Sequence, residues 1–170
     1  CSDGKACYEQ MLSLVMNTSL AQRLKVSHLK GGVNEVILSV GTSEPFAVIN
    51  IGDCATLTTQ LSESSQFDVE PANDFSESLF DKVNEKDSSI NVIIGSRKFT
   101  QGWSCWRVSA MGLLNMGISE GAQIIQLFGR GVRLKGRNYS LKRSKPEERP
   151  KESFLDRLET LNVFGLRATY

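Results

Sequence analysis

Alternating stretches of apolar and turn-forming residues predict the first regular elements of the chain. The apolar runs Val36–Val40 and Phe46–Ile51 are separated by Gly41–Pro45, which predicts a strand, a turn and a second strand. The segment Cys54–Leu61 then predicts a helix, and the polar stretch Ser62–Asn73 predicts a surface loop.

A second helix and a buried strand are predicted after that loop. The apolar residues of the helix recur near the three-to-four spacing of one buried face: Phe75, Leu79, Phe80 and Val83. Asp74 or Ser76 can cap its start. The run Ile90–Ile94 is nearly all apolar and ends at Gly95, which is typical of a central parallel strand covered on both faces.

The remaining pattern completes an alternation of strands and helices. Val108–Met116 predicts a strand, and Gly121–Leu134 predicts a helix from the spacing of its apolar residues. The polar segment Lys135–Lys151 predicts a basic loop or a solvated hairpin. A last helix, Phe154–Leu161 with Ser153 as its cap, leads into the extended run Val163–Ala168. The alternation predicts an α/β fold of three layers with a mainly parallel central sheet.

Length and composition indicate one globular unit. The 170 residues, 40% hydrophobic and 23% charged, exclude a disordered or collagen-like chain and fit a single domain. We expect one lobe over residues 1–170, with 1–28 peripheral and 135–151 as the basic loop. No Met begins the chain, and nothing precedes the apolar helical piece Tyr8–Met16, so we expect a fragment of a larger protein.

The lengths of the apolar runs and the spacing of the cysteines argue against a membrane span, a zinc site and a disulfide framework. No run reaches the roughly 20 residues of a membrane span, so we expect no membrane partner. Cys1, Cys7, Cys54 and Cys105 form no C-x-x-C pair, and the single His28 lies far from Cys54 in sequence. This pattern supports neither a zinc site nor a dense disulfide framework, and we expect reduced thiols in the cytoplasm and no metal ligands.

The chain lacks a triphosphate loop of its own. No G-x-x-x-x-G-K-[ST] motif is present. Gly129 and Gly131 have the first spacing of a dinucleotide fingerprint, but Leu134 stands at the third glycine position and weakens a Rossmann oxidoreductase hypothesis. Because 20 Lys and Arg face 19 Asp and Glu, any affinity for nucleic acid must come from local clustering.

Two arginines on the predicted helix are candidate phosphate ligands. Arg130 and Arg133 are three residues apart, which places them on one helical face. Their guanidinium groups can reach the oxygens of one polyphosphate. Spacing alone favours the simpler alternative, a solvated helix face.

Two motifs carry a resemblance to a known family. Gln126–Arg133 resembles the Q-x-x-G-R-x-x-R motif of the second RecA-like lobe of superfamily-two DEAD/DEAH-like helicases, and Ser96–Ser104 resembles the motif before it. Two longer strings are similar to the restriction (Res) subunit of type III restriction-modification enzymes: Gly95–Ser109 and Gln123–Gly136. The similarity is close over Phe75–Ser144.

The resemblance implies a RecA-like helicase C-terminal lobe that completes an ATP site. ATP and Mg²⁺ would be held with the first RecA-like lobe of the same parent chain, and this fragment alone would bind neither. Arg130 and Arg133 would act as catalytic arginine fingers, and Gln126 and Gly129 would shape the same wall. The implied function is that of an ATP-dependent DNA helicase or translocase within a type III site-specific deoxyribonuclease. Its implied partners are DNA and the modification (methyltransferase) subunit.

The earlier motif would link ATP to DNA. The resemblance implies contacts with the DNA backbone from four residues: Ser96, Arg97, Lys98 and Thr100. Gly102 would permit close approach to the nucleotide. Ser104 stands where an Asp of the family often meets the ribose, so a different ribose contact is expected here.

Several alternatives stay open. Trp103 and Trp106 can stack on bases, although a half-buried structural role is the more common fate of such residues. The stretch Lys135–Lys151 can steer DNA, but its glutamates dilute its charge. The nuclease is expected outside the chain. The competing function is a non-catalytic nucleic-acid-binding or partner-docking domain with a helicase-like fold.

Overall fold

The chain folds into two compact units. The computed structural model describes residues 3–29, 34–73, 77–95, 99, 103–114, 121–131, 138, 140, 142–151 and 155–167. The first unit is Cys1–Lys98 and the second is Phe99–Tyr170. Each unit is described by itself.

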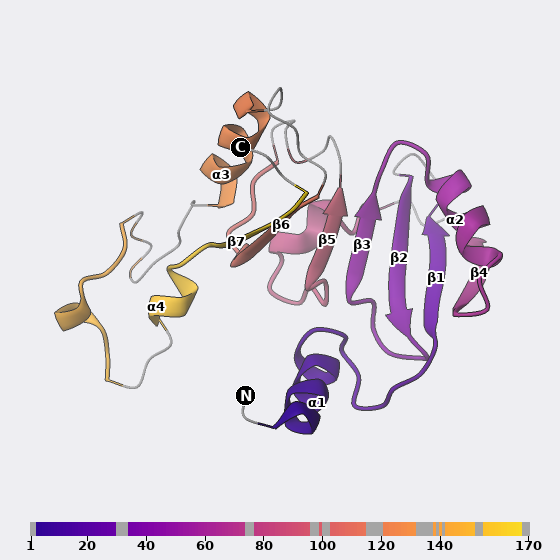
Figure 1. The fold of residues 1–170 in the computed structure, drawn as a ribbon, viewed down its shortest axis with the longest axis horizontal. Helices are drawn as coiled ribbons and strands as arrows, with labels where there is room; N and C mark the ends of the chain where they lie inside the picture. The colour runs from indigo at the N-terminus through magenta and orange to yellow at the C-terminus, as the bar shows by residue number, and fades with distance from the viewer. Residues whose placement is uncertain are drawn as a thin grey trace. The chain divides into compact units, whose positions relative to one another are not determined.

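A mixed five-stranded sheet forms the centre of the first unit (Figure 1). Its strands are β1 (Leu24–Leu29), β2 (Glu35–Val40), β3 (Ala47–Asn50), β4 (Phe67–Asn73) and β5 (Val92–Gly95). Their order is β4-β1-β2-β3-β5. The pairs β1/β2 and β2/β3 are antiparallel, and the pairs β1/β4 and β3/β5 are parallel. The α/β class is confirmed, but the sheet is mixed rather than mainly parallel, because its two inner pairs, β1/β2 and β2/β3, are antiparallel.

The predicted strand, turn and strand are confirmed in β2 and β3. Gly41 adopts φ +54° in the turn between them, a conformation that suits glycine. The Ser43 N–H donates to the Val40 carbonyl at 2.9 Å, which closes the turn. Val36 and Val48 are fully buried on the two strands. The apolar runs and the turn residues between them therefore predicted this part of the fold correctly.

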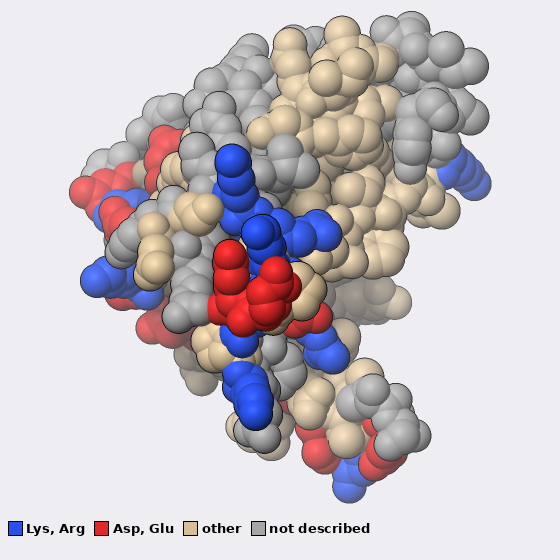
Figure 2. Space-filling model, turned by 90° about the vertical axis from the view of Figure 1, so that its left-hand side faces the viewer, with Lys and Arg blue, Asp and Glu red and all other residues tan. Residues whose placement is uncertain are grey.

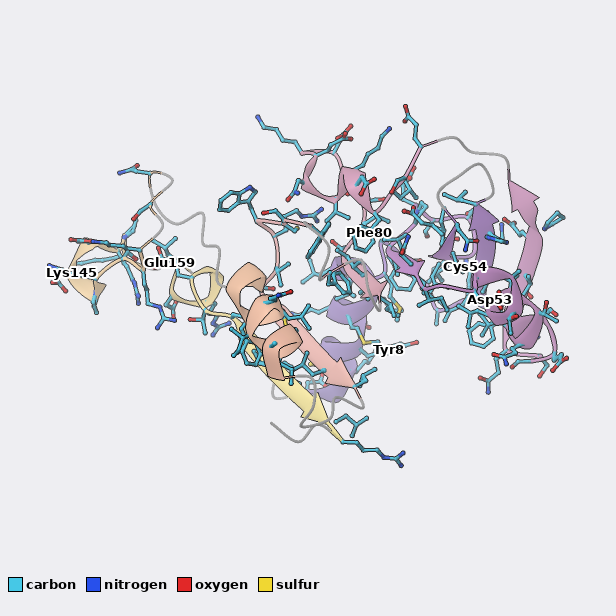
Figure 3. All side chains as sticks on the ribbon, turned by 90° about the horizontal axis from the view of Figure 1, so that it is seen from above. Tyr8, Asp53, Cys54, Phe80, Lys145 and Glu159 are labelled. Atoms are coloured by element: carbon cyan, nitrogen blue, oxygen red, sulfur yellow. The ribbon has the colours of Figure 1, made fainter. Side chains whose placement is uncertain are left out.

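Helix α2 (Cys54–Ser62) covers the core of this sheet, as Figure 1 shows beside β1 and β4. The buried residues Val26, Val36, Ile49 and Cys54 form an apolar cluster that Leu57 and Leu61 of the helix extend. Asp53, labelled with Cys54 in Figure 3, caps the helix. Its carboxylate accepts the Thr56 N–H at 2.9 Å and the Thr56 hydroxyl at 2.6 Å. The start of α2 is therefore the one that the sequence predicted.

An asparagine pair ties the N-terminal helix α1 (Gly4–Leu14) to the sheet. Asn17, at φ 54°, donates through its amide to the carbonyls of Pro45 at 3.1 Å and Ser89 at 2.8 Å. The Asn91 amide donates to Asn17 Oδ1 at 3.0 Å. These bonds join the segment after α1 to the starts of β3 and β5.

The prediction of a surface loop over Ser62–Asn73 is wrong for its second half. Strand β4 runs parallel to β1, and its polar residues pair with polar residues of β1. Glu70 accepts the Ser27 hydroxyl at 2.9 Å and forms an ion pair with Lys25 at 2.5 Å. An edge strand with one solvated face carries such residues readily, so a polar sequence did not exclude a strand.

The predicted helix around Phe75–Val83 is replaced by irregular chain and one short 3₁₀ helix, η1 (Asp81–Asn84). Asp74, Phe75 and Ser76 lie outside the described residues. The fully buried Glu35 carboxylate accepts the Leu79 N–H at 3.0 Å, the Phe80 N–H at 3.4 Å and the Ser78 hydroxyl at 2.5 Å. Because these N–H groups bond to a distant side chain, the segment does not follow a helical ladder.

The strand predicted as central is at the end of the sheet. Strand β5 pairs with β3 in parallel, as expected, and is the last strand in the order of the five-stranded sheet. Ile94 is 45% exposed, which shows that the strand is not covered on both faces.

The second unit contains a parallel pair of strands and a helix. Strand β6 (Ala110–Leu114) pairs with β7 (Asn162–Leu166), and α3 (Gly121–Gly131) lies beside them (Figure 1). The short helices η5 (Pro146–Glu148) and α4 (Leu155–Leu158) follow α3. The last predicted helix is therefore shorter than expected, and Ser153 and Phe154 lie outside the described residues. No helix in the described parts of the chain has the length and apolar character to cross a membrane.

We predict that Glu35→Ala lowers the free energy of unfolding by about 3 kcal/mol, because it leaves the Leu79 and Phe80 N–H groups and the buried Ser78 hydroxyl without their acceptor. Glu35→Gln retains an acceptor oxygen and should cost less. Urea unfolding followed by far-UV circular dichroism measures both. The exposed Glu44→Ala is the control and should stay within about 0.5 kcal/mol of the wild type. Equal stability of Glu35→Ala and Glu44→Ala would contradict the proposed role of Glu35.

We also predict that the cap of α2 makes stability depend on pH. The Thr56 hydroxyl and N–H hold the pKa of Asp53 below its usual value. A lowered folded-state pKa stabilises the fold above the unfolded pKa of about 3.9, and the contribution is lost as the pH falls through the folded pKa. Asp53→Asn keeps a cap oxygen but does not titrate. The stability difference between wild type and Asp53→Asn should shrink below about pH 4 in urea titrations, and a constant difference down to the acid limit would refute this assignment.

Candidate functional site

Helix α3 presents part of the arginine motif on its exposed side. Ile124 is only 3% exposed and fixes the inner face of the helix, and Leu127 and Phe128 are half-buried at the next positions of that face. Gln126 and Gly129 are exposed, three residues apart. A Cβ built on Gly129 would meet no atom of the described residues within 4 Å, so packing against them does not require glycine at this position. Open space lies over this part of the motif.

The two candidate arginine fingers are described only in part. The backbone of Arg130 belongs to α3, one turn after Gln126, and its side chain lies outside the described residues. Arg133 lies wholly outside them. The structure therefore brings Gln126, Gly129 and the Arg130 backbone onto one helix.

Most of the motif Ser96–Ser104 lies outside the described residues. Ser96, Arg97, Lys98, Thr100 and Gly102 lie in the part of the chain that the structure does not describe, and Ser104 is half-buried.

The two tryptophans of this region have different surroundings. Trp103 is half-buried and packs edge-to-face on Phe99, with ring centroids 5.1 Å apart and ring planes at 68°. Trp106 is 44% exposed. A structural role therefore fits Trp103, and Trp106 has a large part of its surface exposed.

Cys105 anchors the segment between the tryptophans. The residue is 2% exposed, and burial raises the pKa of its thiol. The Arg107 N–H donates to Cys105 Sγ at 3.4 Å. The neutral, buried thiol thus fixes a bend from which the exposed residues Trp106 and Arg107 project.

Part of the basic stretch is held by a buried carboxylate. Glu159 accepts the Ser144 N–H at 2.9 Å and the Ser144 hydroxyl at 2.7 Å, and Arg149 lies 3.8 Å from the same oxygen (Figure 3). Arg149 also donates to the Ser144 hydroxyl and carbonyl oxygens. This cluster fixes residues 144–149 against the region of α4. The cations that stay exposed in the described part of the stretch are Lys142, Arg143, Lys145 and Lys151.

Charge is distributed unequally between the two units. The second unit has twelve Lys and Arg against six Asp and Glu, a net charge of +6, and the first has eight against thirteen, a net charge of −5. The whole-chain value of +1 conceals this separation. On the face drawn in Figure 2, blue and red side chains are intermixed, so the excess is not one continuous basic patch there. Sequence reasoning missed the separation because it summed the charge over the whole chain.

No group of three or more His, Cys, Asp and Glu residues that could hold a metal ion occurs among the residues described here. The single histidine serves the fold, because His28 Nε2 lies 3.0 Å from Asn34 Oδ1. Cys54 donates its thiol proton to the Asn34 carbonyl at 3.0 Å.

Comparison with known proteins gives no further assignment. No family model, no curated protein and no solved structure matches the chain. The resemblance to the type III Res subunit therefore depends on the two motifs quoted above.

We predict that the orientation of α3 separates the effects of two neighbouring isoleucines. Ile124→Ala should lower the unfolding free energy by about 3 kcal/mol, because it leaves a cavity beneath the helix. Ile125, which is 71% exposed, should tolerate alanine within about 0.5 kcal/mol. Tryptophan fluorescence during urea unfolding reports on this unit, since both tryptophans lie in it. Equal destabilisation by the two variants would show that the helix is oriented differently.

Proposed function

We propose that the chain is the second motor lobe, with a three-layer RecA-like fold, of an ATP-dependent DNA helicase or translocase, as in the restriction subunit of a type III restriction enzyme. The observation that carries the proposal is the orientation of α3, which buries Ile124 and exposes Gln126 and Gly129 of the arginine motif. A motif that binds a ligand held by another lobe must lie on an exposed face.

The residues present suit a polyanion. The open space over Gly129 admits close approach, and the net charge of +6 on the second unit favours a phosphate-rich ligand. ATP bound with Mg²⁺ in the full-length parent supplies the phosphoanhydride bond whose cleavage drives movement. Gln126 and Gly129 would form the wall facing it. Arg130 and Arg133 would compensate the charge that develops on the transferred phosphoryl group.

The proposal assigns further roles to the neighbouring motif. Ser96, Arg97, Lys98 and Thr100 would contact the DNA backbone, and Gly102 and Ser104 would contact the nucleotide. The first RecA-like lobe of the parent and the modification (methyltransferase) subunit would be the protein partners. A cytoplasmic location suits this assembly. The fragment alone is expected to hydrolyse no ATP.

A non-catalytic nucleic-acid-binding or partner-docking domain is the second candidate function. The excess positive charge of the second unit favours nucleic-acid binding whether or not ATP is used. Three exposed apolar residues of the β6/β7 sheet favour docking of a partner: Leu114, Phe164 and Leu166. Loss of ATP hydrolysis on substitution of the motif arginines separates the motor from this candidate.

We predict that Arg130→Ala and Arg133→Ala each lower the kcat of DNA-stimulated ATP hydrolysis by about a thousandfold or more in the longer protein that carries both lobes, because an arginine finger acts mainly on the transition state. Steady-state ATP hydrolysis with and without DNA measures this. The exposed Arg143→Ala is the matched control and should leave kcat within about twofold of the wild type, since a surface cation outside the motif has no transition-state role. Unchanged kcat in both motif variants, with native circular dichroism, would reject the motor function.

A further inference from the structure

The segment Trp103–Arg107 combines a fixed base with two outward-facing groups. Its base is formed by the Trp103 ring on Phe99 and by the buried Cys105. The hydrogen bond from the Arg107 N–H to Cys105 Sγ spans the bend at Trp106. Trp106 and Arg107 are both exposed next to this anchor. An immobilised backbone lowers the entropy that two such side chains lose when they bind a ligand.

The two exposed groups match the two chemical components of a nucleic-acid strand. An indole face stacks on any base, and a guanidinium group pairs with phosphate oxygens. They belong to the unit whose net charge is +6, which attracts a polyanion over a longer range.

We propose that Trp106 and Arg107 form a contact for single-stranded nucleic acid, in which the Trp106 indole stacks on a base and Arg107 pairs with a neighbouring phosphate. This inference deepens the proposed function, since it rests on nucleic acid being a partner of this lobe. It adds a stacking contact to the backbone contacts already assigned to residues 96–100.

The surroundings of Trp106 favour nucleic acid over a protein partner. A tryptophan at the centre of a protein interface usually lies among other apolar side chains. The exposed neighbours of Trp106 along the segment, Arg107 and Ser109, are charged or polar, whereas the apolar neighbours Cys105 and Val108 are buried or half-buried. Stacking requires a single strand, because the bases of a duplex already stack on one another.

Two single-tryptophan variants test the contact directly. The chain contains two tryptophans, so Trp103→Phe leaves only the Trp106 signal and Trp106→Phe leaves only the Trp103 signal. Each 170-residue variant is titrated with a fluorescein-labelled single strand of twelve thymidines at about 50 mM salt, the low-salt range in which phosphate contacts are strongest. Fluorescein anisotropy reports binding, and tryptophan quenching reports the contact. We expect strong quenching in Trp103→Phe and weak quenching in Trp106→Phe.

Affinity measurements complete the test. Trp106→Ala should weaken binding by about 5- to 150-fold, and Trp106→Phe should weaken it less, because a phenyl ring still stacks. Arg107→Gln should reduce the slope of log K against log salt by about 0.7, the value for one lost phosphate contact on a single strand. A duplex of the same length should quench Trp106 less than the single strand does.

Four results would overturn the inference. They are absence of binding of the single strand, unquenched Trp106 in a bound complex, equal affinities of Trp106→Ala and wild type, and equal quenching by the duplex.

The failure of the proposed motor function can be told apart from the failure of this contact. If Arg130→Ala abolishes ATP hydrolysis in the parent while Trp106 stays unquenched, only the stacking contact is rejected. If Trp106 is quenched while Arg130→Ala hydrolyses ATP normally, the contact stands without the motor.

Discussion

The parallel pairing of β6 with β7 is the constraint on which the presentation of the arginine motif depends. Parallel neighbours cannot be joined by a tight turn, so the chain must cross over between Leu114 and Asn162, and α3 lies within that crossover. The buried side chain of Ile124 then sets the rotation of the helix about its axis. Helical spacing leaves Gln126 and Gly129 on the outside. Apolar packing of Ile124, with Leu127 and Phe128 half-buried on the same face, therefore positions the motif.

The separation of charge gives the two units different tasks. In the first unit, carboxylates serve the fold: Glu35 accepts backbone N–H groups, Asp53 caps α2, and Glu70 joins β4 to β1. An acidic excess there repels a polyanion. In the second unit, Glu159 holds Ser144 and Arg149, but exposed cations such as Arg143 and Arg157 exceed the exposed acids.

The sequence predicted elements whose signals are local. The turn at Gly41 and the Asp53 cap both act within a few residues, so β2, β3 and the start of α2 could be placed from the pattern. Strand β4 could not be placed from the pattern, because the residues that pair with its polar side chains, such as Lys25 with Glu70, lie more than forty residues earlier. The helix predicted near Phe80 failed for the same reason, since Glu35 takes the N–H groups that a helix would use. Non-local hydrogen bonds decided both cases against the local pattern.

In the candidate site, the sequence indicated which residue types can bind a ligand but not which of them are exposed. Residue types at motif spacing are enough to suggest which groups can bind phosphate. Trp103 and Trp106, by contrast, are the same residue type three positions apart, and their sequence surroundings did not distinguish them. The ring of Phe99 packs on Trp103, Cys105 is buried between the two tryptophans, and Trp106 is 44% exposed. The stacking contact proposed for Trp106 and Arg107 would hold a base as well as a phosphate, which a backbone contact alone does not achieve.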